Sequence, residues 1–329
     1  MQSDCDRHTG PRVDAHHGAV RSEPPVPGVG PPPAGLPLPR NVEAETIAVP
    51  ADRGPGNWVG APSALVRDGV HYVAYRRRRP VDDGRGGDVI VARVSGDGTL
   101  TELCRIDKAS MDAESLERPA LVADPGGAWR LYLSCATRGT RHWRVELLRA
   151  ASPDTFVTAR RRVVMPGDEH VAVKDPVIIR DERGWRAWIC CHPLDDPDAT
   201  DRMWTDFATS DDGIEWTVHG PALEPQPGRW DQRGTRVTAV IERGGTMVAF
   251  YDGRANAGEN WEERTGIAEG RPGQLRVVGD APVAQASGAY PALRYTSVVD
   301  EGDRTAVYYE VGCDDGSHEL RREWFARTS

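Results

Sequence analysis

The residues with the clearest chemical potential stand at one repeated position of the chain. That position directly precedes an anchor residue that recurs in five similar copies of sequence, and the anchors are Pro62, Pro119, Pro176, Val237 and Thr296. It holds Ala61, Arg118, Asp175, Arg236 and Tyr295. The position one step earlier holds Gly60, Glu117, Lys174, Thr235 and Arg294. Carboxylates can take part in proton transfer, and arginines bind carboxylate or phosphate groups through paired hydrogen bonds.

A second group of polar and aromatic residues follows the second strand-like run of the copies. The candidates there are Arg76, His192, Asp252, Arg254, Trp261, Glu262, Glu263 and His318. We take Asp175, Glu117, Glu262 and Glu263 as the catalytic candidates. For substrate binding we take Arg118, Lys174, Arg236, Arg294 and Tyr295, together with Arg76, His192, Asp252, Arg254, Trp261 and His318. A general acid needs a raised pKa, and nearby arginines oppose this. Asp175, between Arg118 and Arg236, is therefore expected to orient groups or stabilise charge.

These residues would be positioned by a repeat of 57 to 61 residues. Its copies begin APSALVRDGVHYVAY, RPALVADPGGAWRLYL, DPVIIRDERGWRAWI, RVTAVIERGGTMVAF and YTSVVDEGDRTAVYY. Each copy reads as two strands joined by a charged turn, followed by a third and a weaker fourth strand. Five units of four strands predict an all-β, five-bladed β-propeller. Because the last unit is short, we expect a strand near residues 45–49 to complete it and close the ring.

The propeller geometry explains why the repeated position matters. The first strand of each blade lies nearest the axis, and its starting residues meet at one mouth of the central channel. The loop between the second and third strands opens on the same face. Residues distant in sequence should therefore gather around one pocket.

Composition separates residues 1–40 from the rest of the chain. This stretch is rich in Pro and Gly and poor in aromatic residues, so we expect a disordered leader. Residues 41–329 should form the propeller domain.

Charge and motifs exclude several function classes. A formal net charge of −9 argues against a nucleic-acid partner, and no apolar run is long enough to suggest a membrane span. The six cysteines show no CxxC spacing, and no zinc-ligand pattern, Gly-rich phosphate loop or GxSxG motif is present. We therefore expect neither a metal site nor a cofactor. Without a signal-peptide pattern, a cytoplasmic location is the expectation. The oligomeric state is left open.

The blade starts resemble those of the five-bladed propeller glycoside hydrolases of families 43, 62, 32 and 130. KDPVII at residues 174–179 is similar to a family-43 blade start, which implies for Asp175 the role of adjusting the pKa of the catalytic acid. Ala61 and Arg236 stand where family 43 has its general base and general acid. NWVGAPSALVRDGVHYVAYRR, LERPAL and CCHPL resemble family 130, whose phosphorylases protonate the glycosidic oxygen with an Asp; Arg118 stands at that position.

Three functions follow as hypotheses. The resemblance implies a glycosidase-like hydrolase or phosphorylase that acts on a glycoside in the central pocket. The arginines suggest instead a non-hydrolytic tailoring enzyme, a cyclase or lyase of a bacterial secondary-metabolite pathway, with an anionic substrate. A non-catalytic glycan-binding propeller is the third, because fold alone does not fix function. In each case the partner is a small molecule or a glycan.

Overall fold

The computed structural model describes residues 30–124 and 126–326, which form five four-stranded blades. The first blade contains β2 (Trp58–Arg67), β3 (Val70–Arg78), β4 (Gly86–Val94) and β5 (Leu100–Asp107). The second contains β6 (Ala113–Ala123), β7 (Trp129–Thr137), β8 (Trp143–Ala150) and β9 (Arg161–Met165). The third contains β10 (Val171–Asp181), β11 (Gly184–Pro193), β12 (Trp204–Ser210) and β13 (Thr217–Leu223).

The last two blades complete the ring. The fourth contains β14 (Gly234–Arg243), β15 (Thr246–Arg254), β16 (Arg264–Arg271) and β17 (Gln274–Val278). The fifth contains β18 (Leu293–Asp300), β19 (Arg304–Gly312), β20 (His318–Ala326) and β1 (Glu45–Ala48). Three short 3-10 helices lie between strands: η1 (Val81–Asp83), η2 (Pro153–Thr158) and η3 (Ala257–Glu259).

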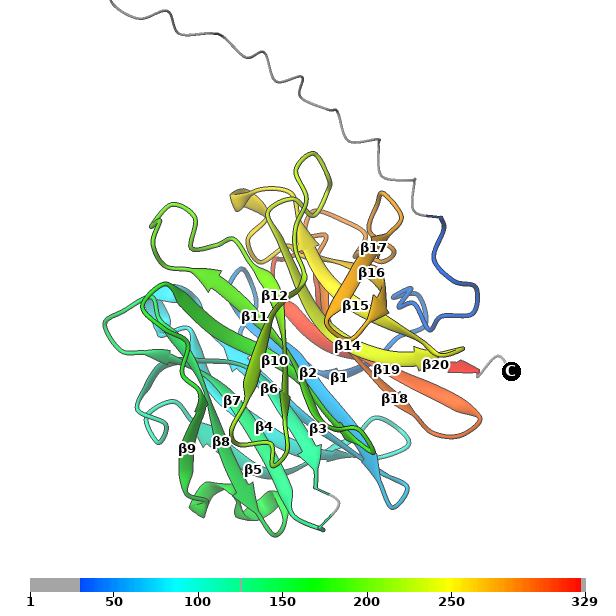
Figure 1. Cartoon of the computed structure of the whole chain (residues 1–329). Coiled ribbons are helices and arrows are strands. Elements are labelled where there is room, and N and C mark those ends of the chain that lie inside the picture. The colour runs from blue at the N-terminus through cyan, green and yellow to red at the C-terminus, as the bar shows by residue number, and fades with distance from the viewer. Residues whose placement is uncertain (1–29, 125, 327–329) are drawn as a thin grey trace, which may run out of the picture.

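The five inner strands surround the axis as predicted. β2 contacts β6, β6 contacts β10, β10 contacts β14, β14 contacts β18, and β18 contacts β2 (Figure 1). The five-bladed propeller expected from the repeat is therefore confirmed.

Each inner strand is irregular at the repeated position. The pairing of the first two strands of every blade shifts register at Gly60/Ser63, Leu116/Pro119, Lys174/Val177, Val237/Ala239 and Arg294/Ser297. Ala61, Asp175 and Tyr295 adopt left-handed backbone conformations with φ of 51°, 50° and 54°. Such bulges redirect side chains that a regular strand would point to alternate faces. The repeated bulge places these residues at the axis.

The predicted closing strand is also confirmed. β1 pairs antiparallel with β20, so the chain's first strand is the outer strand of the last blade, and both lie together in Figure 1. Glu45 accepts a hydrogen bond of 2.8 Å from Nε of the almost fully buried Arg322. This pairing covers the edge of β20 that would otherwise remain open.

The packed part of the chain begins before the expected boundary at residue 41. Leu36 is buried against blade-four residues that include Val248, Phe250 and Ile267. The backbone N–H groups of Arg40 and Asn41 both donate to the buried Glu323 carboxylate. Two leucines within a proline-rich stretch provide the apolar contact that the composition argument overlooked. The expectation for residues 1–29 lies outside the described residues.

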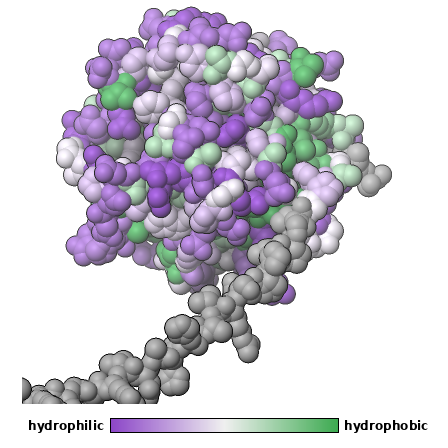
Figure 2. All heavy atoms as spheres, turned by 90° about the horizontal axis from the view of Figure 1, so that it is seen from above, coloured by the Kyte–Doolittle hydropathy of each residue, from purple (hydrophilic) through white to green (hydrophobic). Residues whose placement is uncertain are grey.

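The cores lie between and within the blades, and the surface is polar. Separate apolar clusters join blade one to blade two, blade two to blade three and blade three to blade four. Figure 2 shows a mostly hydrophilic face, with apolar residues gathered beside the place where the chain enters the domain. Within the described ranges, no helix has the length and apolar character needed to cross a membrane.

The contact made by Leu36 yields a stability prediction. Leu36→Ala should lower the free energy of unfolding by about 2–3 kcal/mol, because it removes buried methyl groups from a packed cluster. Urea denaturation followed by tryptophan fluorescence measures this change. Val42→Ala is the matched control, since Val42 is 82% exposed, and should change stability by less than about 0.5 kcal/mol. Equal effects of the two substitutions would contradict the packing of this segment.

Candidate functional site

Asp175 lies at the centre of a charge network that joins the blades. Its Oδ1 accepts a hydrogen bond from the Arg118 backbone N–H at 3.2 Å, and its Oδ2 accepts one from Arg236 Nη1 at 3.1 Å. The Tyr295 hydroxyl donates to the same Oδ2 at 3.4 Å, and Lys174 Nζ lies 3.6 Å away. Asp175 is completely buried. The predicted convergence of these repeat positions is therefore confirmed by their contacts.

Arg236 continues this network into the fourth and fifth blades. Its guanidinium donates to Asp252 Oδ2 at 2.7 and 3.1 Å and lies 4.0 Å from the centre of the Tyr295 ring. Asp252 also accepts the Tyr295 backbone N–H at 3.0 Å. Burial raises the pKa of Asp252 to about 6, while Arg236 opposes that shift. Arg236 is thus held rigidly by two carboxylates and one aromatic ring.

Arg294 forms the corresponding network of the fifth blade. It donates to Glu310 Oε1 at 2.8 and 3.0 Å and also to Glu263. Glu310 further accepts a hydrogen bond from His318 Nδ1 at 2.7 Å. Gly60 leaves the room for Glu310, because a Cβ at Gly60 would lie 2.5 Å from the Glu310 side chain.

Arg118 crosses the channel rather than facing a ligand. Its Nη2 donates to the Thr238 carbonyl at 2.6 Å and its Nε to the Pro62 carbonyl at 3.3 Å. These carbonyls belong to blades four and one, so the side chain links opposite sides of the ring. Burial lowers the pKa of Arg118 to about 10, and Asp175 opposes that effect.

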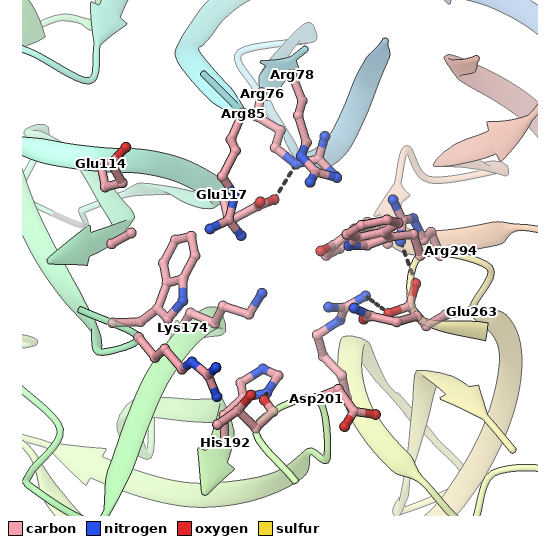
Figure 3. A pocket seen from close by; sticks show the side chains of 18 of the residues that line it. Arg76, Arg78, Arg85, Glu114, Glu117, Lys174, His192, Asp201, Glu263 and Arg294 are labelled. Atoms are coloured by element: carbon pink, nitrogen blue, oxygen red, sulfur yellow. Dashed lines mark hydrogen bonds and ion pairs between the residues drawn. The ribbon is translucent and has the colours of Figure 1, made fainter. Parts of the chain in front are cut away.

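A cavity of about 270 Å³ opens above this network, and all five blades contribute to its lining. Eight Lys or Arg side chains and four Asp or Glu side chains line it. Figure 3 shows labelled side chains pointing inward around an open centre, among them Arg76, Glu117, Lys174 and His192. The pocket is therefore locally basic in a protein whose formal net charge is −9.

Two arginines on the same strand differ in their pairing. Arg76 contacts Glu117 at 2.6 Å and Glu310 at 3.2 Å. Arg78 is 4% exposed, and no carboxylate of the described residues lies within ion-pair distance of it. Its guanidinium instead contacts two indoles that meet edge to face, 4.2 Å from the Trp58 ring centre and 5.0 Å from that of Trp261. Burial lowers the pKa of Arg78 to about 10, so this guanidinium stays charged at neutral pH.

Aromatic surfaces complete the cavity wall. Trp58, Trp143 and Trp261 all line it. Trp261 is 42% exposed and has a φ of 93°, a conformation that a bulky residue rarely adopts. Backbone strain of this kind is concentrated at ligand-binding positions. The cavity therefore offers flat apolar faces beside its cations.

His192 contributes a neutral imidazole. Its Nδ1 lies 3.1 Å from the Thr200 carbonyl and its Nε2 lies 3.5 Å from Cys190 Sγ. The carbonyl can only accept, so Nδ1 carries the proton and Nε2 is left as the basic atom. Burial and the neighbouring Lys174 hold the pKa of His192 well below its usual value.

The structure separates the predicted site residues into two groups. Those that line the cavity are Glu117, Glu263, Lys174, Arg236, Arg294, Tyr295, Arg76, His192, Arg254 and Trp261. Those outside the lining are the buried Asp175, Arg118, Asp252 and His318 and the half-buried Glu262. Glu262 accepts the Ala292 N–H at 3.2 Å, and His318 stacks on Trp58. The catalytic roles assigned to the carboxylates stay predictions.

Sequence reasoning missed several lining or supporting residues. They are Arg78, Arg85, Trp58, Trp143 and Glu310. Strand alternation would have indicated Arg78, because Arg76 and Arg78 face one side of β3 while Arg77 and Arg79 face the other. Glu310 is directly opposite Arg294 in the strand pairing, as Asp252 is opposite Arg236. A search for cross-strand opposite charges would have found that pair.

Two of the predicted carboxylates, Glu117 and Glu263, line the cavity and are held in the ionised form. Burial disfavours the Glu117 carboxylate, but Arg76, Lys174 and Arg78 outweigh it, and its pKa is about 2. Burial also disfavours the Glu263 carboxylate, but the charges of Arg294, Arg236 and Arg254 outweigh this effect and hold the pKa of Glu263 well below its usual range. The pKa of Glu262, behind the lining, is raised by burial. Among the residues that the structure describes, no cluster of three or more His, Cys, Asp or Glu could hold a metal ion.

Comparison with known proteins shows that solved structures of glycoside hydrolases share this fold. No protein-family model matches the chain, and no curated protein matches it in sequence. A thermostable family-43 glycoside hydrolase is 14% identical, with a TM-score of 0.66 over 86% of this chain and 97% of that one. A structure from glycoside hydrolase family 130, a family of mannoside phosphorylases that contains glycoside hydrolases targeting β-1,2-mannosidic linkages, is also 14% identical. Its TM-score is 0.61 over 92% and 99% of the two chains.

A further similar structure is a family-43 enzyme from Xanthomonas citri complexed with xylotriose. It is 14% identical, with a TM-score of 0.59 over 87% of this chain and 91% of that one. These likenesses confirm the glycosidase-like β-propeller fold that the blade-start motifs suggested.

The depressed pKa of Glu117 yields a pH prediction. In the unfolded chain this carboxyl titrates near 4.5, and in the fold at about 2. Its ionised form therefore stabilises the fold above pH 4.5, by about 3 kcal/mol, and this contribution is lost as pH falls towards 2. Glu117→Gln should lower the free energy of unfolding by about 3 kcal/mol at pH 7. The difference from the parent protein should shrink as the pH is lowered.

Urea denaturation between pH 3 and pH 7 measures this effect. Glu102→Gln is the matched control, because Glu102 forms an exposed ion pair with Arg105 and should change stability by less than about 1 kcal/mol. If Glu117→Gln lowers the free energy of unfolding by the same amount at pH 3 and at pH 7, the ionised Glu117 that pairs with Arg76 is not the source of this stability.

Proposed function

We propose that the axial pocket binds an acidic carbohydrate, a sugar carrying a carboxylate or a comparable anionic group. The observation that carries this proposal is Arg78, a buried and charged guanidinium that has no carboxylate within ion-pair distance among the described residues. Burying an unpaired charge is costly, so a protein retains one where a ligand completes the pairing. Arg85 lines the same pocket, and no carboxylate of the described chain lies within ion-pair distance of it either.

The local geometry favours a planar anion. Arginine presents its N–H groups in a fixed fork that matches a carboxylate or phosphate. The Trp58 and Trp261 rings meet edge to face, with centres 5.6 Å apart, and both contact the Arg78 guanidinium. The Nε of Arg78 and the Nε of Arg85 are both buried without a hydrogen-bond partner. An anion here would satisfy donors that the fold leaves open.

The aromatic walls and the fold support a carbohydrate as the rest of the ligand. Indole faces stack well on the apolar faces of sugar rings. Trp261, which lines the cavity and is 42% exposed, offers such a face, whereas Trp58 and Trp143 are buried in the wall. A similar structure contains bound xylotriose. The cavity volume of about 270 Å³ is at the small end of ligand pockets, which suits a single sugar unit.

Hydrolysis by two carboxylates has less support than anion binding. That reaction needs a carboxylic acid with a raised pKa beside the glycosidic oxygen. The pKa values of Glu117, Asp201 and Glu263, which line the cavity, are all lowered. Carboxylates held as anions cannot donate the required proton at neutral pH.

Proton abstraction in the manner of a lyase is the second candidate function, and His192 favours it. Its imidazole is neutral and lines the cavity beside Lys174 and Arg254. A bound carboxylate paired with arginine acidifies the adjacent C–H bond, and Nε2 could accept that proton. The arginine pairing would stabilise the resulting enolate charge.

Ligand binding tests the proposal directly. Isothermal titration with D-galacturonate and D-glucuronate should show saturable binding that weakens with added salt, because the contact is electrostatic. D-galactose and D-glucose should bind much more weakly. Binding of the neutral sugars alone would contradict the proposal.

The matched pair Arg78→Gln and Arg76→Gln separates binding from folding. Arg78→Gln should cost about 2 kcal/mol of binding, about a 30-fold loss of affinity, and should leave the free energy of unfolding unchanged or higher. Arg76→Gln should lower that free energy by about 3 kcal/mol or more, because Glu117 and Glu310 lose a partner. Urea denaturation and titration of both variants measure this. Destabilisation by Arg78→Gln would show that Arg78 serves the fold instead.

A further inference from the structure

A second pocket lies directly beside the axial one. Its volume is about 250 Å³, and it shares Trp58, Arg78 and Arg85 with the axial pocket. The remaining lining comes from the segment between β1 and β2, from β2, from β3, β4 and the loop between them, and from Lys108. It includes the carboxylates of Asp52, Asp83 and Asp88. The three shared side chains therefore form a partition that both pockets can use.

The second pocket contains cations that the fold does not neutralise. Arg77 is paired with Asp88, but within the described ranges no carboxylate lies within ion-pair distance of Arg79 or Arg85. Arg79 is exposed, and Arg85 is partly buried with its Nε unpartnered. Arg78, at the partition, is 4% exposed and also has an unpartnered Nε. A second anionic group could thus be held between Arg79 and the partition.

The loop that carries Arg85 is fixed before any ligand binds. The backbone N–H of Arg85 donates to Pro80 at 3.2 Å, and Lys108 Nζ donates to the Gly84 carbonyl at 2.6 Å. Arg85 itself has a φ of 59°, a left-handed conformation that is uncommon for a residue other than glycine. Strain and fixation together favour a preorganised binding position over a mobile surface loop.

We infer that the second pocket is a subsite for the next acidic unit of an oligosaccharide, which passes over Trp58 and Arg78. This inference rests on the proposed function and names its substrate class: a chain of at least two acidic sugars, with the first unit in the axial pocket. In this arrangement Arg79 binds the second sugar unit and does not contact the first.

Titration of the full chain with oligogalacturonates tests this inference. Digalacturonate should bind about tenfold tighter than galacturonate, because a second charge-assisted contact is added. Arg79→Gln should remove most of that gain and leave galacturonate binding unchanged. Arg93→Gln is the matched control, because it removes the same charge from an exposed position of β4 in the same blade, and it should change neither affinity.

The outcomes distinguish the two proposals. If galacturonate binds but digalacturonate binds no better, or if Arg79→Gln weakens both ligands equally, the subsite is overturned and the axial pocket stands. If neither galacturonate nor digalacturonate binds, the proposed function itself fails.

Discussion

The structure depends on the pairing of charges where five blades meet. Water is largely excluded at the axis, so each charge placed there needs an opposite charge or a hydrogen-bond partner from its own blade or another one. Asp175 of blade three joins Arg236 of blade four, and Arg236 joins Asp252, which accepts the backbone N–H of Tyr295 in blade five. Arg118 connects blades one and four through backbone carbonyls. This network therefore holds the blades of the ring together and also forms the base of the axial pocket, which we call its floor.

That dual role explains why the cavity walls differ from its floor. In the floor, Asp175, Arg236 and Asp252 pair with one another, and the Arg118 guanidinium donates to backbone carbonyls. Arg78 and Arg85 line the cavity against indole rings, and no carboxylate of the described residues lies within ion-pair distance of either. A protein gains no stability from a desolvated cation of this kind, and sites that sacrifice stability are commonly functional. Under the proposed function, Arg78 and Arg85 are the arginines with which a ligand pairs.

The repeat made the fold predictable from the sequence. Which of the predicted site residues line the cavity, and which lie buried below it, could not be predicted. Five anchors at near-constant spacing implied the ring, and the ring implied that Arg118, Asp175 and Arg236 would meet. Sequence spacing could not show that Arg118 points across the channel, because the bulge at each anchor sets the side-chain direction. Leu36 was missed for a different reason: one buried leucine can anchor a stretch whose average composition suggests disorder.

The position of Arg236 bears on what chemistry this propeller can perform. Its guanidinium is held by Asp175 and Asp252 and stacks on Tyr295, so it cannot move to release a proton or exchange partners. Because its charge is already balanced by these two carboxylates, Arg236 offers no free positive charge to a ligand. The charge available for binding lies instead on Arg78 and Arg85 in the wall, for which the described residues supply no carboxylate within ion-pair distance. Cations of this kind favour anionic ground states and enolate-like transition states and disfavour the cationic oxocarbenium-like state of glycoside hydrolysis. The arginines of the wall therefore favour an acidic ligand.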